Sequence, residues 1–286
     1  MEKYTAEKYI RQIMLFGEEG QEKLKKATAL VVGAGGFGSP ISTYLAVAGV
    51  GKIVLADFDS VELSNLNRQF LHHEKDVGIE KIKSAEEKLL SLNPEIKVET
   101  IREKITDENA DSIVPPCDII IDALDNFDTR HVLNRLAVKR NIPLVHGAVS
   151  GYRGQATTVI PEKTPCLCCI YPTSFKKEVF PVLGTTPGVI GAIQANEAIK
   201  YLAGQGELLE NRLLLWDGLS CSFSELKINK SENCPICGVN KKERSYSELI
   251  FHSFFIYSLI LSFVIHSPHI VYFLTLSFFI RPLFTP

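Results

Sequence analysis

The stretch from residue 30 to residue 81 carries side chains that suit a bound nucleotide. An apolar, strand-like run ends at Val32 and leads into a glycine-rich turn that contains Gly33, Gly35, Gly36 and Gly38. Glycines here permit a tight turn, a close approach of the backbone to a ligand, and a closely packed helix whose N-terminus favours an anion. Asp57 ends the next strand-like run, where its carboxylate can accept hydrogen bonds from both hydroxyls of a ribose. This pattern predicts a nucleotide site.

Polar and basic side chains that follow this turn distinguish the pattern from that of a dehydrogenase. They are Ser64, Asn65, Asn67, Arg68 and Lys81. A guanidinium binds phosphate oxygens in a bidentate manner, and a lysine adds a compact charge. Either residue alone could form a surface salt bridge instead. Because both fall between the second and third predicted strands, the pair favours a triphosphate over a dinucleotide.

Two further candidates follow the fourth predicted strand. Asp125 and Asn126 lie where that strand reaches the carboxyl edge of the sheet, which is where ligands bind in open α/β sheets. A carboxylate at this edge can hold magnesium on the phosphates. Asn126 can orient the nucleotide or cap the next helix, and the sequence supports both roles equally. Asp59 is expected to be a cap or turn residue.

Four of the seven cysteines form two C-x-x-C pairs, Cys166 with Cys169 and Cys234 with Cys237. In a chain that begins without a signal peptide, this spacing favours metal binding over disulfides. Four thiolates offer a closed tetrahedral zinc site, which is structural and not catalytic. Free or redox-active thiols are the alternative. Cys168 lies between two predicted ligands and could compete with Cys169.

The order of elements predicts an α/β fold with a Rossmann-like, doubly wound and mostly parallel sheet. Strands are expected at 29–32, 52–56, 97–101, 118–122 and 143–146, with helices at 40–48, 81–92 and 129–139. Later strands at 155–161, 212–216 and 223–228 predict an antiparallel extension, and a helix is expected at 188–202. Residues 161–187, between the strand at 155–161 and the helix at 188–202, form a long irregular segment. Such a long loop in a compact domain is usually functional.

The final residues differ in composition from the rest of the chain. Residues 249–280 contain no Asp, Glu, Lys or Arg, and the apolar stretch 249–265 is at the short limit for a membrane helix. A membrane anchor, a buried oligomerisation element and a non-native ending produced by a frameshift all fit. We favour the last, because the metal pattern is complete at Cys237. The charged segment 1–26 predicts a helix, so the expected compartment is the cytoplasm, with membrane contact only through a native tail.

Together, these motifs resemble those of the MoeB/ThiF/HesA family, the prokaryotic relatives of ubiquitin-activating enzymes. The resemblance runs from Tyr9 to Gly238 and implies one adenylation domain at residues 1–244, followed by a hydrophobic tail at 245–286. It implies an adenylyltransferase that uses ATP and Mg²⁺ to activate the C-terminal glycine of a ubiquitin-like sulfur-carrier protein ending in Gly-Gly, with release of pyrophosphate. Molybdopterin synthesis, thiamine synthesis, tRNA thiolation and cysteine supply all use such activators.

The resemblance also implies roles for individual residues. Asp57 is implied to hold the ribose, and Arg68 and Lys81 the phosphates. Asp125 is implied to hold magnesium, with Asn126 beside it at the nucleotide. These assignments add Mg²⁺ to the Zn²⁺ already expected at the cysteines.

Arg11 looks like the arginine that one protomer of a homodimer inserts into its partner's site, so we expect it to join Arg68, Lys81 and Asp125 in catalysis. Relatives that form a covalent sulfur link often carry a cysteine in the segment before the helix at 188, but residues 180–187 contain none. Adenylation alone is therefore expected, with Cys117 and Cys221 as the remaining thiol candidates.

Three other functions remain open. An ATP-dependent dehydratase acting on tRNA belongs to the same superfamily, but the net charge of −2, from 31 basic and 33 acidic side chains, does not favour nucleic acid. An NAD-dependent oxidoreductase would leave Arg68, Lys81 and Asp125 without a role. A non-catalytic scaffold is the third. None of the seven histidines is in an obvious position for a general base, and His72 and His146 are expected to be structural.

Overall fold

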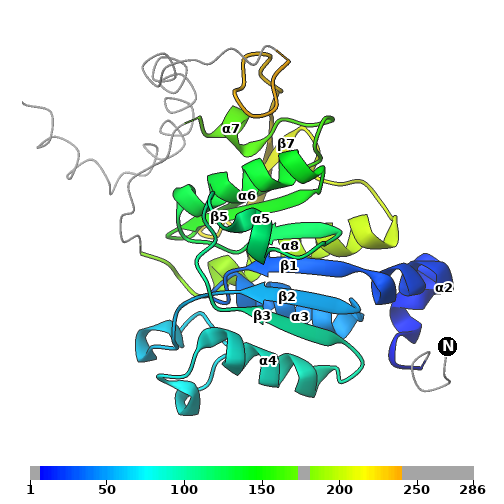
Figure 1. Cartoon of the computed structure of the whole chain (residues 1–286), viewed down its shortest axis with the longest axis vertical. Coiled ribbons are helices and arrows are strands. Elements are labelled where there is room, and N and C mark those ends of the chain that lie inside the picture. The colour runs from blue at the N-terminus through cyan, green and yellow to red at the C-terminus, as the bar shows by residue number, and fades with distance from the viewer. Residues whose placement is uncertain (1–6, 173–180, 240–286) are drawn as a thin grey trace, which may run out of the picture.

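Eight strands form one sheet in the computed structural model, which describes residues 7–172 and 181–239 (Figure 1). Across the sheet, the strand order is β3-β2-β1-β4-β5-β6-β7-β8. Five strands run parallel: β1 (Thr28–Val32), β2 (Lys52–Ala56), β3 (Lys97–Ile101), β4 (Ile119–Asp122) and β5 (Leu144–Ser150). Three strands continue the sheet antiparallel: β6 (Arg153–Val159), β7 (Arg212–Asp217) and β8 (Ser222–Lys227). This arrangement confirms the predicted parallel sheet and its antiparallel extension.

The central strands are continuous apolar runs because helices cover both of their faces. Every residue of β4 is buried, and four of the five residues of β1 and β2 are buried. One face packs against α2 (Ile10–Lys26), α3 (Gly38–Ala48), α4 (Lys81–Leu92) and α8 (Thr185–Ala203). The other packs against α5 (Ala110–Ile113), α6 (Phe127–Arg140) and α7 (Leu167–Ile170) (Figure 1). The fold is therefore doubly wound.

The point where the winding reverses fixes the location of a ligand crevice. From β1 the chain passes through α3 to β2 on one side, whereas β4 pairs with the other side of β1. In open α/β sheets, ligands bind outside the carboxyl ends of the strands at such a reversal. The loops that follow β1, β2 and β4 contain the predicted nucleotide-site residues.

Most predicted elements occur within a few residues of their expected bounds, and three details differ. The helix expected over 1–26 includes α2, which is broken at Gly17, whose φ is 72°, and residues 1–6 lie outside the described residues. β5 continues to Ser150 and pairs with β6 as a hairpin. The predicted irregular segment contains the short helix α7, while its residues 173–180 lie outside the described residues.

The predicted hydrophobic tail at 245–286, with the stretch 249–280, also lies outside the described residues. Across 7–172 and 181–239, no helix has the length and apolar character needed to cross a bilayer.

Candidate nucleotide and metal sites

The glycine-rich turn is built by close backbone approaches that a side chain would prevent. Gly33 has a φ of 108°, and a Cβ there would lie 2.4 Å from the carbonyl oxygen of Ala123. A Cβ at Gly38, where α3 begins, would lie 2.1 Å from the carbonyl oxygen of Gly33. The turn is therefore pressed against the loop after β4, and the N-terminus of α3 faces the same crevice.

Asp57 holds this turn from the carboxyl end of β2. Its Oδ2 accepts a 2.7 Å hydrogen bond from the amide of Ala34, and its Oδ1 accepts one of 2.8 Å from the amide of Asp59. Burial raises the pKa of Asp57, against the opposing effects of Lys81 and of these two hydrogen bonds. Each carboxylate oxygen keeps a second lone pair, so the group that orders the turn can also accept hydrogen bonds from a ribose.

Arg68 lies against the same turn. Its Cγ would be 3.5 Å from a Cβ at Gly36, so the arginine stem lies beside the glycine-rich turn. The guanidinium donates to the carbonyl oxygen of Ser64 at 2.9 Å and to Oδ1 of Asn67 at 3.1 Å. These contacts hold a partly exposed cation beside the glycine-rich turn.

The other members of the polar cluster build the local turn. Oδ1 of Asn65 accepts a hydrogen bond from the amide of Glu62 and caps a short 3₁₀ helix at Leu63–Asn65. Oγ of Ser64 donates to a carboxylate oxygen of Glu62 at 3.2 Å. These contacts hold Arg68 beside the glycines.

Lys81 is a buried cation at the first residue of α4. Only 6% of the residue is exposed, and its Nζ lies 2.8 Å from Oδ2 of Asp59, whose side chain is 52% exposed. Asp59 was expected to be a cap or turn residue, but it does not cap α4. The N-cap position of α4 is Glu80, and the carboxylate of Asp59 pairs with Lys81 instead. A second positive charge thus lies close to Asp57 and the turn.

Two carboxylates lie at the end of β4 and in the loop after it, and their surroundings differ sharply. Asp122 is fully buried, with Oδ2 at 2.6 Å from Nδ1 of His146 and 3.1 Å from Nε of Arg130. Although burial opposes it, these partners hold the pKa of Asp122 below its ordinary value, so it stays ionised within the core. Asp125 is exposed at the edge of the sheet. Of the two, Asp125 is the one that a metal ion can reach.

Asn126 caps α6, which was one of its two expected roles. Its Oδ1 accepts a 3.0 Å hydrogen bond from the amide of Thr129. Its Nδ2 lies 3.3 Å from Oδ1 of Asp125, so the cap also helps to place the neighbouring carboxylate.

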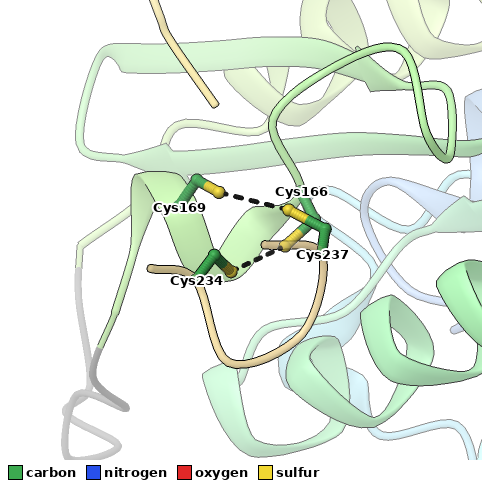
Figure 2. A group of neighbouring side chains, drawn as sticks. All are labelled: Cys166, Cys169, Cys234 and Cys237. Carbon is green, nitrogen blue, oxygen red and sulfur yellow. Dashed lines mark hydrogen bonds between the residues drawn. The ribbon is translucent and has the colours of Figure 1, made fainter. Parts of the chain in front are cut away.

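The four predicted metal ligands meet at one point. Cys166 and Cys169, from the start of α7, face Cys234 and Cys237 from the segment after β8 (Figure 2). Their sulfur atoms all lie within 4.8 Å of one another, with Cys166 to Cys234 at 3.6 Å and Cys169 to Cys237 at 3.4 Å. A tetrahedral zinc–thiolate site with bonds of about 2.3 Å places its sulfurs about 3.8 Å apart. The donor set therefore fits zinc.

The comparisons with known proteins agree with this geometry. The model of the ThiF family matches residues 9–236. The chain belongs to the ThiF family. It is 41% identical over 240 residues to the SAMP-activating enzyme E1 of Haloferax volcanii, covering 81% of this chain and 88% of that protein. It is also 41% identical over 255 residues to the sulfur carrier protein adenylyltransferase of Thermus thermophilus, covering 85% and 94%.

Solved structures share the fold with this ThiF-family chain. A crystal structure of Escherichia coli MccB with ATP superposes with a TM-score of 0.72 at 28% identity, covering 81% of this chain and 73% of that one. These similarities confirm the predicted family resemblance.

One predicted site residue lies apart from the others. Arg11 is exposed on α2, and its neighbour Gln12 donates to the carbonyl oxygen of Ala48 at the far end of α3. Since α3 has 11 residues, its two ends, one beside Gln12 and the other at the glycine-rich turn, are about 16 Å apart. Figure 1 shows α2, the helix that carries Arg11 in this ThiF-family protein, at the end of the sheet opposite the carboxyl ends of the parallel strands.

The remaining cysteines differ in environment. Cys168 is buried beside the sulfur cluster but is not among its four members. Burial raises the pKa of Cys117 to about 11, so this thiol stays protonated at neutral pH. Cys221 is exposed in the turn between β7 and β8, where its φ is 53°.

Two residues near the site carry no sequence signal of their own. Arg130, predicted only as part of a helix, donates to the carbonyl oxygens of Leu124 and Gly147 at 2.6 and 3.0 Å. It thereby fixes the loop that carries Asp125. His72, expected to be structural, contacts the glycine-rich turn through its ring. The sequence places neither contact, because each joins elements that are distant along the chain.

Proposed function

We propose that this chain is an ATP-dependent adenylyltransferase that activates the C-terminal glycine of a ubiquitin-like sulfur-carrier protein as an acyl-adenylate, with release of pyrophosphate. The observation that carries the proposal is the gathering of Arg68 and Lys81 around one glycine-rich turn, with Asp125 on the adjoining loop. Relatives with 41% identity are named for carrier activation and for sulfur-carrier adenylylation.

The chemistry of acyl-adenylate formation matches these side chains. A carboxylate that approaches the α-phosphate is repelled by the negative charge of the triphosphate. The enzyme must therefore neutralise that charge and align the two reactants, with little proton transfer to perform. Arg68 can bind phosphate oxygens in a bidentate manner, and Lys81 provides a second, buried charge. Asp57 would bind the ribose and so fix the nucleotide along the sheet edge.

Magnesium fits at Asp125. Its carboxylate is an exposed oxygen ligand at the edge of the sheet, and Mg²⁺ is usually held by one or two carboxylates together with substrate phosphates. The ion would supply further positive charge on the phosphates. Asn126 and Arg130 would keep the loop in place, through the hydrogen bonds described above.

Zinc in the cysteine cluster has a structural role in this proposal. A closed shell of four thiolates leaves no open position for a substrate. The site joins α7 to the segment after β8, and the amide of Leu167 also donates to Oδ1 of Asn134 on α6 at 2.8 Å. Zinc would therefore fasten this end of the chain to the face of the sheet that α6 covers.

A homodimer would bring Arg11 of one chain to the nucleotide site of the other chain. Arg11 lies at the opposite end of the sheet from its own crevice, so it can add positive charge only to a partner's site. The helix that carries it also exposes Met14 and Leu15, at 74% and 82%. A second copy of the chain would cover such apolar side chains and deliver the arginine.

Carrier-dependent exchange of labelled pyrophosphate into ATP tests the proposal. Exchange that needs Mg²⁺ and a small protein ending in Gly-Gly is expected, and removal of the terminal glycine should abolish it. Exchange with a tRNA acceptor instead would favour the dehydratase alternative, and reduction of NAD would favour an oxidoreductase. Either result would refute the proposal.

A further inference from the structure

We infer that His72 is a positioning residue of the nucleotide site: its buried ring joins the glycine-rich turn to the helix that carries Lys81. The ring itself touches neither phosphate nor metal in this account. The inference rests on the proposed function, because it requires ATP to bind at the glycine-rich turn.

The two ring nitrogens of His72 bridge two elements. Nε2 lies 2.8 Å from the carbonyl oxygen of Ala34 in the turn, and Nδ1 lies 2.8 Å from Oγ of Ser84 in α4. A carbonyl can only accept, so Nε2 must carry a proton. In the neutral ring, Nδ1 is then an acceptor, and it shares the single proton of the Ser84 hydroxyl with the carboxylate of Asp76. His72 and Ser84 are both buried, with 3% and 2% of their surfaces exposed.

The bond to Ala34 controls where the next amide points. The peptide that joins Ala34 to Gly35 is planar and trans, so its C=O and N–H groups point in opposite directions. Because the carbonyl oxygen of Ala34 points toward the His72 ring, the amide of Gly35 points away from that ring. The preceding amide, of Ala34 itself, is held by Asp57 at 2.7 Å. The turn is thus fixed on both sides of Ala34, by Asp57, the proposed ribose ligand, and by His72.

The bond to Ser84 connects this arrangement to the phosphate-binding lysine. Ser84 lies three residues after Lys81 on α4, about one helical turn away. Its Oγ lies 3.0 Å from Oδ2 of Asp76 and 3.0 Å from Nζ of Lys88, which form an ion pair with each other. Burial raises the pKa of Asp76, but Lys88 and the hydrogen bonds to the carboxylate outweigh this effect and lower the pKa to about 2. Ser84 is therefore a fixed anchor for the ring.

The charge state of the ring follows from the same surroundings. Burial lowers the pKa of His72, against the hydrogen bond to Ala34. Lys81 and Lys88 lower the pKa further, whereas Asp76 raises it. The ring is neutral at physiological pH, so it orders the turn without adding charge beside the phosphates. His146, the fully buried histidine on β5, bonds Asp122 and not the turn.

Two conservative variants separate positioning from general stability. The amide nitrogen of His72→Gln reaches the place of Nε2 and can still donate to Ala34, whereas that of His72→Asn reaches only the place of Nδ1. Loss of a buried hydrogen bond at the turn corresponds to about a tenfold change in affinity. We therefore expect the KM for ATP to be about tenfold higher in His72→Asn than in His72→Gln, with the KM for the carrier unchanged in both.

Two other variants provide the controls. Glu197→Gln alters a buried carboxylate that accepts from Thr158 and from the amide of Leu209, away from the turn. It should lower the melting temperature without changing the KM for ATP. Ser84→Ala removes the Nδ1 contact together with the contacts of Ser84 to Asp76 and Lys88. It leaves the bond from Nε2 to Ala34 in place and should raise the KM for ATP severalfold, so it tests the inference even where His72→Asn does not fold.

The outcomes distinguish this inference from the proposed function. An active wild-type enzyme for which His72→Asn, His72→Gln and Ser84→Ala share the wild-type KM for ATP would overturn the inference alone. The inference would also be overturned if Glu197→Gln raised the KM for ATP in proportion to the melting temperature that it loses. A wild-type protein without any exchange activity would overturn both.

Discussion

Replacing Lys81 by methionine tests the charge that most directly separates this site from a dinucleotide site. The Lys81 side chain is 8% exposed, and its Nζ lies 2.8 Å from Oδ2 of Asp59. Methionine fills a similar volume while removing the charge. A hydrogen bond that involves a charged group contributes about 1.5–3 kcal/mol, which corresponds to about a 10- to 100-fold loss of ATP affinity. The fold should be retained.

The partner of Lys81 gives a prediction of opposite sign. In the structure, Lys81 is paired with Asp59, so a phosphate must compete with this carboxylate for the lysine. Since the Asp59 side chain is 52% exposed, the pair is worth at most about 1 kcal/mol, which limits the gain to about fivefold. Asp59→Asn is therefore expected to tighten ATP binding by up to about fivefold.

Titration with ATP, together with the KM for ATP in the exchange reaction, measures both effects. Lys139→Met is the matched control, because it removes a lysine that pairs with Asp111 at 2.5 Å on the surface of α6, away from the crevice. It should leave ATP affinity unchanged. Wild-type affinity in Lys81→Met, or equal losses in Lys81→Met and Lys139→Met, would refute the assignment of Lys81 to the phosphates.

Four further predictions address the metal sites, the dimer and the tail. Asp125→Ala should abolish exchange with fold and zinc content unchanged, and retained exchange would contradict the magnesium assignment. Cys169→Ser should lower zinc below one equivalent per chain and reduce the melting temperature, whereas full zinc content would show that Cys168 substitutes for it. Arg11→Ala mixed with Asp125→Ala should recover about a quarter of wild-type sites through mixed dimers, whereas no recovery would place Arg11 outside its partner's site. Removal of residues 245–286 should leave exchange unchanged, and loss of folding or dimerisation would assign those residues a role.

Short-range patterns made the fold predictable. Continuous apolar runs such as β4 indicate strands buried on both faces, and their alternation with helices indicates a parallel sheet. The glycine-rich turn could be identified because its glycines are closely spaced along the chain, and the approach of Gly38 to the carbonyl oxygen of Gly33 is local. The C-x-x-C spacing likewise identified the four cysteines, although the segments that carry them are distant along the chain.

Burial and long-range contacts determine what the sequence could not show. Asp122 and Asp125 look equivalent in the sequence, yet one is buried against Arg130 and His146 while the other is exposed. The contact of His72 with Ala34 joins residues 38 positions apart, and no local pattern specifies it. The N-capping role of Asn126 depends on the start of α6, which the predicted helix placed two residues late.

The central claim is that this crevice binds a nucleoside triphosphate with magnesium in order to form an acyl-adenylate. A single measurement tests it most directly: incubation of the purified protein with labelled pyrophosphate, ATP, Mg²⁺ and a small carrier protein ending in Gly-Gly. The account predicts label in ATP only when carrier and Mg²⁺ are both present. Absence of labelled ATP under these conditions with a folded carrier, together with no affinity of the protein for ATP, would contradict it.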